Sequence, residues 1–229
     1  MYQLNQLLSI LLFLIAIYFI YCVIALCINH FNKRIWFNFG ELKNNDIQLR
    51  YIEDLLLPEE CSHLINIAKD KLSRSKVVNT KDDHYDESRT SYSYYFDVAH
   101  DDIIKTIEKR ISLLILKPLE TIEALQVVRY EDGQEFKEHY DWFQDEYRDK
   151  INNQRQYTFF VYLNNVENGG ETLFPKLNLS FKPKAGNALF WENCYSFNDC
   201  YDEALHQGKS PKGETKYGLN IWINYNNLR

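Results

Sequence analysis

The chain has 229 residues, which is long enough for one ordinary domain and an additional segment. Hydrophobic residues make up 45% of it and charged residues 25%, a composition that excludes a disordered or low-complexity protein. The formal net charge is −6 and the basic residues are scattered, so no nucleic acid is expected as a partner.

The first segment is an uncharged apolar run at residues 7–28, with the sequence LLSILLFLIAIYFIYCVIALCI. It is long enough to cross a bilayer as one helix. It is also longer than the apolar stretch of a cleaved signal peptide, and no small-residue cleavage site follows it. We therefore expect a single transmembrane helix as a membrane anchor within residues 1–30, followed by a polar linker over residues 31–46.

The orientation of this anchor is left open by the sequence. Lys33 and Arg34 follow the apolar run, and the positive-inside rule would then leave the domain in the cytoplasm. Against this, the pattern NLS at Asn178 is an acceptor for N-glycosylation, which has a meaning only in a secretory lumen. Cys194 and Cys200 are equally compatible with a loop disulfide and with two free thiols.

The remainder divides into a part with helices and strands, residues 47–122, and a strand-rich part, residues 123–229. In the first part, helices are predicted from Pro58 through apolar positions up to Leu72, and over residues 100–115. Later the apolar period changes from about 3.6 to about 2, which predicts strands. These are expected within residues 125–130, 157–166, 179–191 and 217–225. The order of elements indicates an α+β fold whose sandwich or barrel carries the site.

A pair of polar residues in the strand-rich part indicates a metal site. His139 and Asp141 are two positions apart, so on a strand they would share one face, and their burial would require a partner such as a metal ion. His206 is the best third ligand, because the other histidines have simpler explanations. Two histidines and a carboxylate form the facial triad of non-haem Fe(II) oxygenases, although zinc hydrolases use the same set. Lys216 would either bind the far carboxylate of a dicarboxylic co-substrate or be a solvated surface residue.

Several sequence blocks, in their order and spacing, resemble the prolyl 4-hydroxylase catalytic domain of the small plant, algal and viral type. The blocks are LLLPEECSHLINIAKDKLSRSKVV, ESRTS, IEKRIS, LQVVRYEDGQEFKEHYDWF, YLNNVENGGETLFP, FKPKAGNALFW and LHQGKSPKGETKYGLNIWI. The resemblance covers about residues 50–226. It implies a 2-oxoglutarate (2OG) and Fe(II)-dependent dioxygenase with a double-stranded β-helix (jelly roll) core and supporting N-terminal helices.

The resemblance also implies a role for each residue that matches a family motif. The implied Fe(II) ligands are His139, Asp141 and His206. The implied 2OG contacts are Lys216, Tyr130 and Thr172. The implied contacts with the peptide are Arg155, Trp222, Phe136 and Arg89, and residues 82–95 would form a mobile flap. Phe136 stands where a tyrosine is common, which leaves room for a different acceptor preference.

The implied activity is peptidyl-proline 4-hydroxylation of collagen-like or proline-rich proteins. It would be coupled to the oxidative decarboxylation of 2OG by O2, with L-ascorbate keeping the iron reduced. The family implies a catalytic domain in the lumen of the endoplasmic reticulum. Two alternatives stay open: the same chemistry on another side chain such as lysine, and a non-catalytic module that binds proline-rich peptides. The complete set of ligands together with Lys216 favours an enzyme.

Overall fold

The computed structural model describes residues 37–38, 47–77 and 84–228. The predicted anchor at residues 1–30 lies outside them, as does most of the predicted linker. Among the described residues, no helix is long and apolar enough to cross a membrane. The chain divides into one unit over residues 1–37 and another over residues 38–229.

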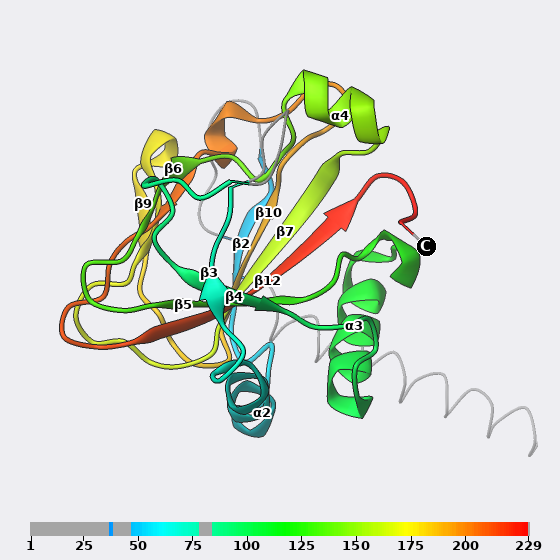
Figure 1. Cartoon of the computed structure of the whole chain (residues 1–229). Helices are drawn as coiled ribbons and strands as arrows, with labels where there is room; N and C mark the ends of the chain where they lie inside the picture. The colour runs from blue at the N-terminus through cyan, green and yellow to red at the C-terminus, as the bar shows by residue number, and fades with distance from the viewer. Residues whose placement is uncertain (1–36, 39–46, 78–83, 229) are drawn as a thin grey trace, which may run out of the picture. The chain divides into compact units, whose positions relative to one another are not determined.

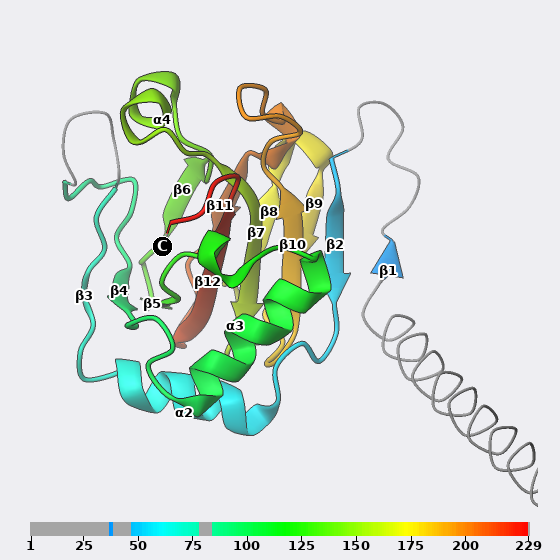
Figure 2. The ribbon, with the colours of Figure 1, turned by 90° about the vertical axis from the view of Figure 1, so that its right-hand side faces the viewer.

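The described part of the second unit is built on two antiparallel sheets (Figures 1 and 2). Strand β1 (Phe37–Asn38) precedes them along the chain. From β2 onwards, the larger sheet has the order β2 (Leu49–Ile52), β10 (Ala188–Glu192), β7 (Arg155–Tyr162), β12 (Lys216–Asn224), β5 (Gln126–Tyr130), β4 (Tyr92–Tyr95) and β3 (Ser73–Arg74). The smaller sheet has the order β6 (Phe136–His139), β11 (His206–Gly208), β8 (Thr172–Phe174) and β9 (Leu179–Phe181).

The hydrophobic core lies between these sheets. Phe174 and Phe181 of the smaller sheet share one buried cluster with Phe160, Tyr162 and Trp191 of the larger sheet. Alternating strand residues supply this core because successive side chains point to opposite faces. The result is the sandwich that the change of apolar period predicted, and it matches the expected jelly-roll core.

Helix α3 (Asp102–Ile115) lies across the other face of the larger sheet and helix α2 (Pro58–Ala68) lies at its lower end, as Figure 2 shows. The two helices are joined by Arg110, whose guanidinium donates to both carboxylate oxygens of Glu60 at 2.8 and 2.7 Å. Asp101 caps α3 by accepting a hydrogen bond from the Ile104 amide. The buried face of α3, which includes Ile104, Ile107 and Ile111, is turned away from solvent and supports the larger sheet.

The predicted elements agree with the structure except at some boundaries. Helix α2 ends at Ala68 instead of Leu72, because the amide of Lys71 bonds to the Ala68 carbonyl and the chain leaves the helix in a turn. The single strand expected over residues 179–191 is two strands, β9 and β10. Gly186 lies between them with φ +82°, a value that a turn requires and that an extended strand does not allow.

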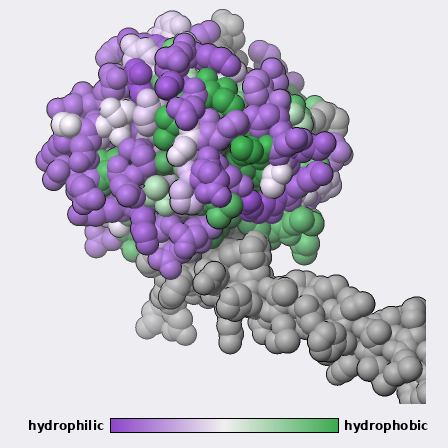
Figure 3. All heavy atoms as spheres, turned by 90° about the horizontal axis from the view of Figure 1, so that it is seen from below, coloured by the Kyte–Doolittle hydropathy of each residue, from purple (hydrophilic) through white to green (hydrophobic). Residues whose placement is uncertain are grey.

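The connections also carry short elements. Helix α4 (Asp145–Ile151) follows the β6 strand, and the 3₁₀ turns are η1 (Leu119–Thr121), η2 (Pro175–Leu177) and η3 (Asp202–Ala204). Cys194 and Cys200 form a disulfide in the connection before η3, which decides between the two alternatives for this pair. Asn178 lies in an exposed turn after η2. Seen from below in Figure 3, the described surface is largely hydrophilic with small apolar patches.

Candidate active site

The three predicted metal ligands converge at one end of the smaller sheet. His139 is the last residue of β6, and His206 is the first residue of β11 and pairs directly with it. Asp141 follows two residues beyond β6. One nitrogen or oxygen atom from each of the three side chains lies within 4.8 Å of the others, which is close enough for all three to hold one metal ion.

The prediction that His139 and Asp141 share a face of one strand is wrong. Strand β6 ends at His139, and Asp141 lies in the bend that follows. Residues of β7 hold Asp141 there: its carbonyl accepts a hydrogen bond from Arg155 at 3.4 Å, and its carboxylate accepts one from the Thr158 hydroxyl at 2.8 Å. The carboxylate is therefore directed by the larger sheet, whereas both histidines belong to the smaller one.

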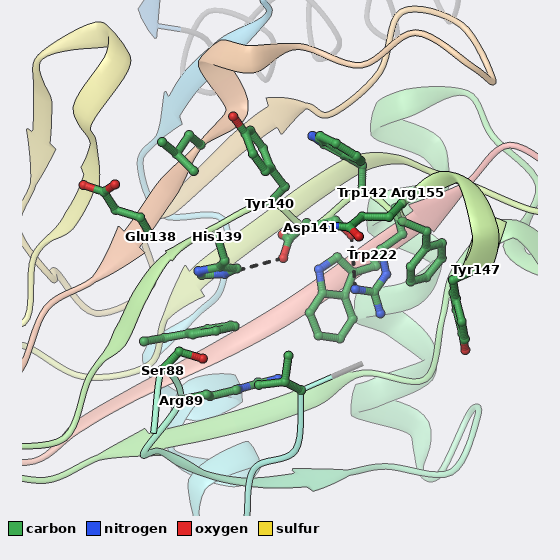
Figure 4. A pocket seen from close by; sticks show the side chains of 15 residues that line it. Ser88, Arg89, Glu138, His139, Tyr140, Asp141, Trp142, Tyr147, Arg155 and Trp222 are labelled. Atoms are coloured by element: carbon green, nitrogen blue, oxygen red, sulfur yellow. Dashed lines mark hydrogen bonds and ion pairs between the residues drawn. The ribbon is translucent and has the colours of Figure 1, made fainter. Parts of the chain in front are cut away.

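Backbone carbonyls orient both imidazole rings. Nδ1 of His139 lies 2.7 Å from the Lys137 carbonyl, and Nδ1 of His206 lies 2.9 Å from the Ala204 carbonyl. Because a carbonyl only accepts, each Nδ1 carries the hydrogen and each Nε2 presents its lone pair. Nε2 of His139 lies 3.8 Å from Oδ1 of Asp141 (Figure 4), and Nε2 of His206 lies 3.9 Å from Oδ2 of Asp141. Metal-binding histidines are held in this way.

The charge states of these groups also suit a cation. Burial, together with the neighbouring His206, lowers the pKa of His139 well below its usual value, so the ring is neutral at pH 7. Burial acts to raise the pKa of Asp141, but His206, His139 and Arg155 outweigh it and the pKa is lowered. His139 therefore offers a neutral nitrogen and Asp141 an anionic oxygen, and both are donor types that Fe(II) takes in this kind of triad.

Lys216 is fully buried at the start of β12. Its Nζ has no hydrogen-bond partner among the described residues. It lies 5.1–5.6 Å from the ring centroids of Phe160, Tyr130 and Tyr162. Burial lowers the pKa of Lys216 to about 7. Lys216 is thus not a solvated surface lysine. A buried ammonium without an anion is suited to a ligand that brings a carboxylate.

A small cavity joins Lys216 to the three metal ligands. Tyr130 and Thr172, both predicted to contact 2OG, line it. Burial raises the pKa of Tyr130, so its hydroxyl stays protonated and able to donate. Asn220 also lines the cavity and was missed by the sequence analysis. Its signal was the alternation along β12, because every second residue from Lys216 points to this side.

A larger cavity of about 400 Å³ lies beside His139 and Asp141 (Figure 4). All four predicted peptide contacts line it: Arg155, Trp222, Phe136 and Arg89. Its wall also contains aromatic residues that no sequence pattern indicated: Tyr140, Trp142, Phe143 and Tyr147. The wall of this cavity is therefore rich in aromatic side chains, and it also contains the charged residues Arg89, Glu138, Asp141 and Arg155.

Arg155 shapes this wall, and its charge is already paired. Its guanidinium donates to both carboxylate oxygens of Glu123 at 2.7 Å. The guanidinium carbon lies 3.8 Å from the ring centroid of Trp222 and 4.7 Å from that of Phe143. Arg155 therefore fixes two aromatic rings of the cavity and has no free charge for an anionic ligand.

The predicted flap over residues 82–95 is only partly a loop. Residues 92–95 form β4 of the larger sheet, and residues 82–83 lie outside the described residues. The backbone between them pairs with the chain ahead of the metal ligands: the Thr90 amide bonds to the Glu135 carbonyl, and the Lys137 amide to the Ser88 carbonyl. These bonds place Arg89 beside the larger cavity.

Comparisons with known proteins agree with this geometry. Residues 125–224 match the 2OG-Fe(II) oxygenase superfamily, a range that includes all three metal ligands and Lys216. Prolyl 4-hydroxylase 5 of Arabidopsis thaliana is 34% identical over 197 residues, which cover 77% of this chain and 68% of that protein. Probable prolyl 4-hydroxylase 3 of the same plant is 39% identical over 160 residues, which cover 60% of this chain and 56% of the relative's length.

A solved structure extends the likeness to the fold. It is a viral collagen prolyl hydroxylase from Paramecium Bursaria Chlorella virus-1 in complex with 2OG. The TM-score is 0.64 at 29% sequence identity, and the match covers 81% of this chain and 99% of the viral one. The described domain thus has the architecture of a 2OG-binding oxygenase.

Proposed function

The chain belongs to the prolyl 4-hydroxylase family of 2OG-Fe(II) oxygenases, and we propose that it hydroxylates proline residues in proline-rich or collagen-like polypeptides at the expense of 2OG. The observation that carries the proposal is the convergence of His139, Asp141 and His206 beside the buried, unpaired Lys216. One cavity contains all four, and a second, aromatic cavity begins at the same triad.

His139, Asp141 and His206 would hold Fe(II). Bound there with 2OG and O2, the metal would supply the oxidation of an unactivated C–H bond, for which side chains alone have no acid or base chemistry. The protein's part is to present two imidazole nitrogens and a carboxylate in fixed orientations. Both imidazoles are already fixed by the carbonyls of Lys137 and Ala204.

Lys216 would pair with the distal carboxylate of 2OG. Its ammonium is buried among aromatic rings that exclude water, so the attraction to a carboxylate is strong there. Tyr130 can donate a hydrogen bond to the same group. Thr172 lines the same cavity, and its hydroxyl is hydrogen-bonded to the Tyr162 hydroxyl at 3.0 Å.

The aromatic cavity would bind the peptide. A proline-rich segment is already extended as a polyproline II helix, so it loses little conformational entropy on binding to aromatic side chains. Arg155 and Trp222 are part of this wall, and Arg155 donates a hydrogen bond to the Asp141 carbonyl. The names of the relatives, prolyl 4-hydroxylases and a viral collagen prolyl hydroxylase, support proline as the acceptor.

We also propose that residues 7–28 anchor the chain in the membrane of the endoplasmic reticulum, with the catalytic domain in the lumen. The Cys194–Cys200 disulfide and the exposed Asn178 acceptor support this side of the membrane. The test is glycosidase digestion of the chain from cells. A mobility shift that is lost in Asn178→Gln supports a luminal domain, and digestion of the domain by protease in sealed microsomes contradicts it.

The activity is tested with the full chain, Fe(II), 2OG, L-ascorbate and proline-rich peptides. Addition of one oxygen atom to the peptide and release of succinate are followed together, with His139→Ala as the control. Equal amounts of both products, absent in His139→Ala, are expected. Succinate without peptide oxidation would indicate another acceptor such as a lysine side chain. Peptide binding without either product would indicate a binding module.

A further inference from the structure

We propose that Thr158 and Asn193 are positioning residues for the Asp141 carboxylate. They act through a chain of side-chain hydrogen bonds that begins at the indole of Trp191 and ends at Asp141 Oδ2. The inference rests on the proposed metal site, of which Asp141 is one ligand. It assigns a role to residues that neither touch the metal nor line the peptide cavity in their own right.

The chain consists of three hydrogen bonds. The Trp191 indole Nε1 donates to Asn193 Oδ1 at 2.9 Å. The Asn193 amide Nδ2 donates to Thr158 Oγ1 at 2.9 Å, and the Thr158 hydroxyl donates to Asp141 Oδ2 at 2.8 Å. Trp191, Asn193 and Thr158 are at most 1% exposed. Water therefore does not compete for these bonds, and each is stronger than it would be at the surface.

The direction of every bond follows from the chemistry of the first donor. An indole N–H can only donate, so Asn193 must present its oxygen to Trp191 and its NH₂ group to Thr158. Thr158 then uses a lone pair to accept that bond, and its single hydroxyl hydrogen is directed to Asp141. An ionised carboxylate can only accept. The arrangement therefore has one orientation, and Asp141 receives a hydrogen bond in it.

The sheet backbone holds the members of the chain in place. Trp191 on β10 pairs directly with Thr158 on β7, two strands that lie side by side in Figure 1. The Asn193 amide continues this pairing with a 2.7 Å bond to the Gln156 carbonyl. The Trp191 ring also lies 4.7 Å from the ring of His206. Trp191 thus contacts one metal ligand and begins the chain that orients another.

The consequence is a carboxylate whose plane is fixed before any metal arrives, with Oδ1 toward His139 and Oδ2 toward His206. A carboxylate without this hydrogen bond would rotate freely. Metal binding would then have to order it, and the free-energy cost of this ordering would lower the metal affinity. Loss of one outer hydrogen-bond partner of a ligand typically weakens metal binding by about 10- to 100-fold. We expect a loss in that range when the Thr158 hydroxyl is removed.

The experiment measures Co(II) binding to the full chain by competition with a chelator and by visible absorption. Thr158→Val removes the hydroxyl and keeps the shape, and it is expected to raise the Kd about 10- to 100-fold. Thr158→Ser restores the hydroxyl and is expected to restore the affinity. The matched control is Thr121→Val, since Thr121 is also buried but donates to the Pro118 carbonyl, away from Asp141. Its Kd should equal that of the wild type.

An unchanged Kd in Thr158→Val would overturn the inference. Failure of the wild type to bind Co(II) would instead contradict the proposed metal site, so the two failures are distinguishable. If Thr158→Val does not fold by circular dichroism, Trp191→Phe takes its place, because it keeps a ring beside His206 and removes the first donor. A higher Kd for Co(II), together with a changed Co(II) absorption spectrum, would support the chain of hydrogen bonds. Wild-type values for both would refute it.

Discussion

The ring of Phe136 lies flat against the imidazole of His139, with ring centroids 3.4 Å apart and planes at 16°. The guanidinium carbon of Arg89 lies 4.7 Å from the same phenyl centroid. Since the imidazole covers one face of Phe136, the guanidinium covers the other. His139, a proposed metal ligand, is therefore held on its Nδ1 edge by the Lys137 carbonyl and on its face by the stacked side chains of Phe136 and Arg89.

This stack makes a prediction for Phe136. Phe136→Leu keeps an apolar side chain but loses the flat contact, so His139 gains freedom to rotate. We expect metal binding to become less favourable by about 1 kcal/mol, which is the typical stabilisation from an aromatic pair. Phe136→Tyr keeps the ring and is the control. Titration with Co(II) decides: equal affinities in the leucine and tyrosine variants would show that the stack does not orient His139.

Lys216 is predicted to reduce the stability of the free protein while serving the co-substrate. Lys216→Met removes a buried, unpaired ammonium and leaves a side chain of similar length among aromatic rings. The free energy of unfolding should rise on the order of 1–4 kcal/mol. Binding of 2OG should weaken by about 2–5 kcal/mol, because its carboxylate would be buried without a cation.

Urea unfolding and calorimetric titration with 2OG measure the two effects. The matched control is Lys209→Met, since Lys209 is an exposed lysine shortly before Lys216 and should change neither quantity. A Lys216→Met variant that unfolds more easily than the wild type would contradict the assignment of an unsatisfied charge. A Lys216→Met variant that binds 2OG as tightly as the wild type would show that the 2OG carboxylate does not bind at Lys216.

The affinity for 2OG is predicted to fall as the pH rises above 7. In the free protein Lys216 has a pKa of about 7, so it becomes neutral above that pH, whereas the bound carboxylate requires it charged. Binding must then take up a proton, and the affinity should decrease by up to about tenfold per pH unit. Calorimetry in buffers of different ionisation enthalpy counts the protons. Binding without proton uptake at alkaline pH would exclude this coupling.

The lowered pKa of Lys216 also determines how the stability of the free chain should depend on pH. The pKa of Lys216 is lowered in the folded state from 10.5 to about 7, so between these values the unfolded chain holds a proton that the folded chain has released. The free energy of unfolding should therefore rise with pH through this window. The comparison is with Lys216→Met, in which this part of the pH dependence should be missing.

Gly218 is predicted to keep the 2OG cavity open. A Cβ at this position would lie 2.3 Å from Cζ of Phe160, whose ring lines the cavity. Gly218→Ala should therefore displace that ring, lower the free energy of unfolding by about 1–3 kcal/mol and raise the KM for 2OG. Adding Phe160→Leu should recover part of both losses. Losses that simply add in the double variant would show that the two residues are not coupled.

Much of the site was predictable because it is encoded in local patterns. The donor types of His139, Asp141 and His206 indicate a metal whatever the fold, and the alternation of β12 places Lys216 and Trp222 on one face. The turn at Gly186 was not predicted, although a glycine within a strand pattern is a local signal of such a break. Such features depend on neighbours along the chain, and the sequence contains them directly.

The remainder depends on contacts between distant segments. Asp141 leaves the strand because Arg155 and Thr158 hold it, and no local pattern contains those bonds. The chain from Trp191 to Thr158 arises from the register of β10 against β7, which a strand prediction does not specify. The aromatic residues around residues 140–147 follow neither helical nor strand periodicity, so their common cavity appears only in three dimensions.

The most direct test of the account identifies the oxidised residue. A proline-rich peptide that also contains lysine is incubated with the full chain, Fe(II), 2OG and L-ascorbate, and its hydrolysate is analysed for hydroxylated amino acids. The account predicts 4-hydroxyproline in the wild-type reaction and none with His139→Ala. Hydroxylysine without hydroxyproline, while succinate is released, would contradict proline as the acceptor and leave only the oxygenase chemistry in place.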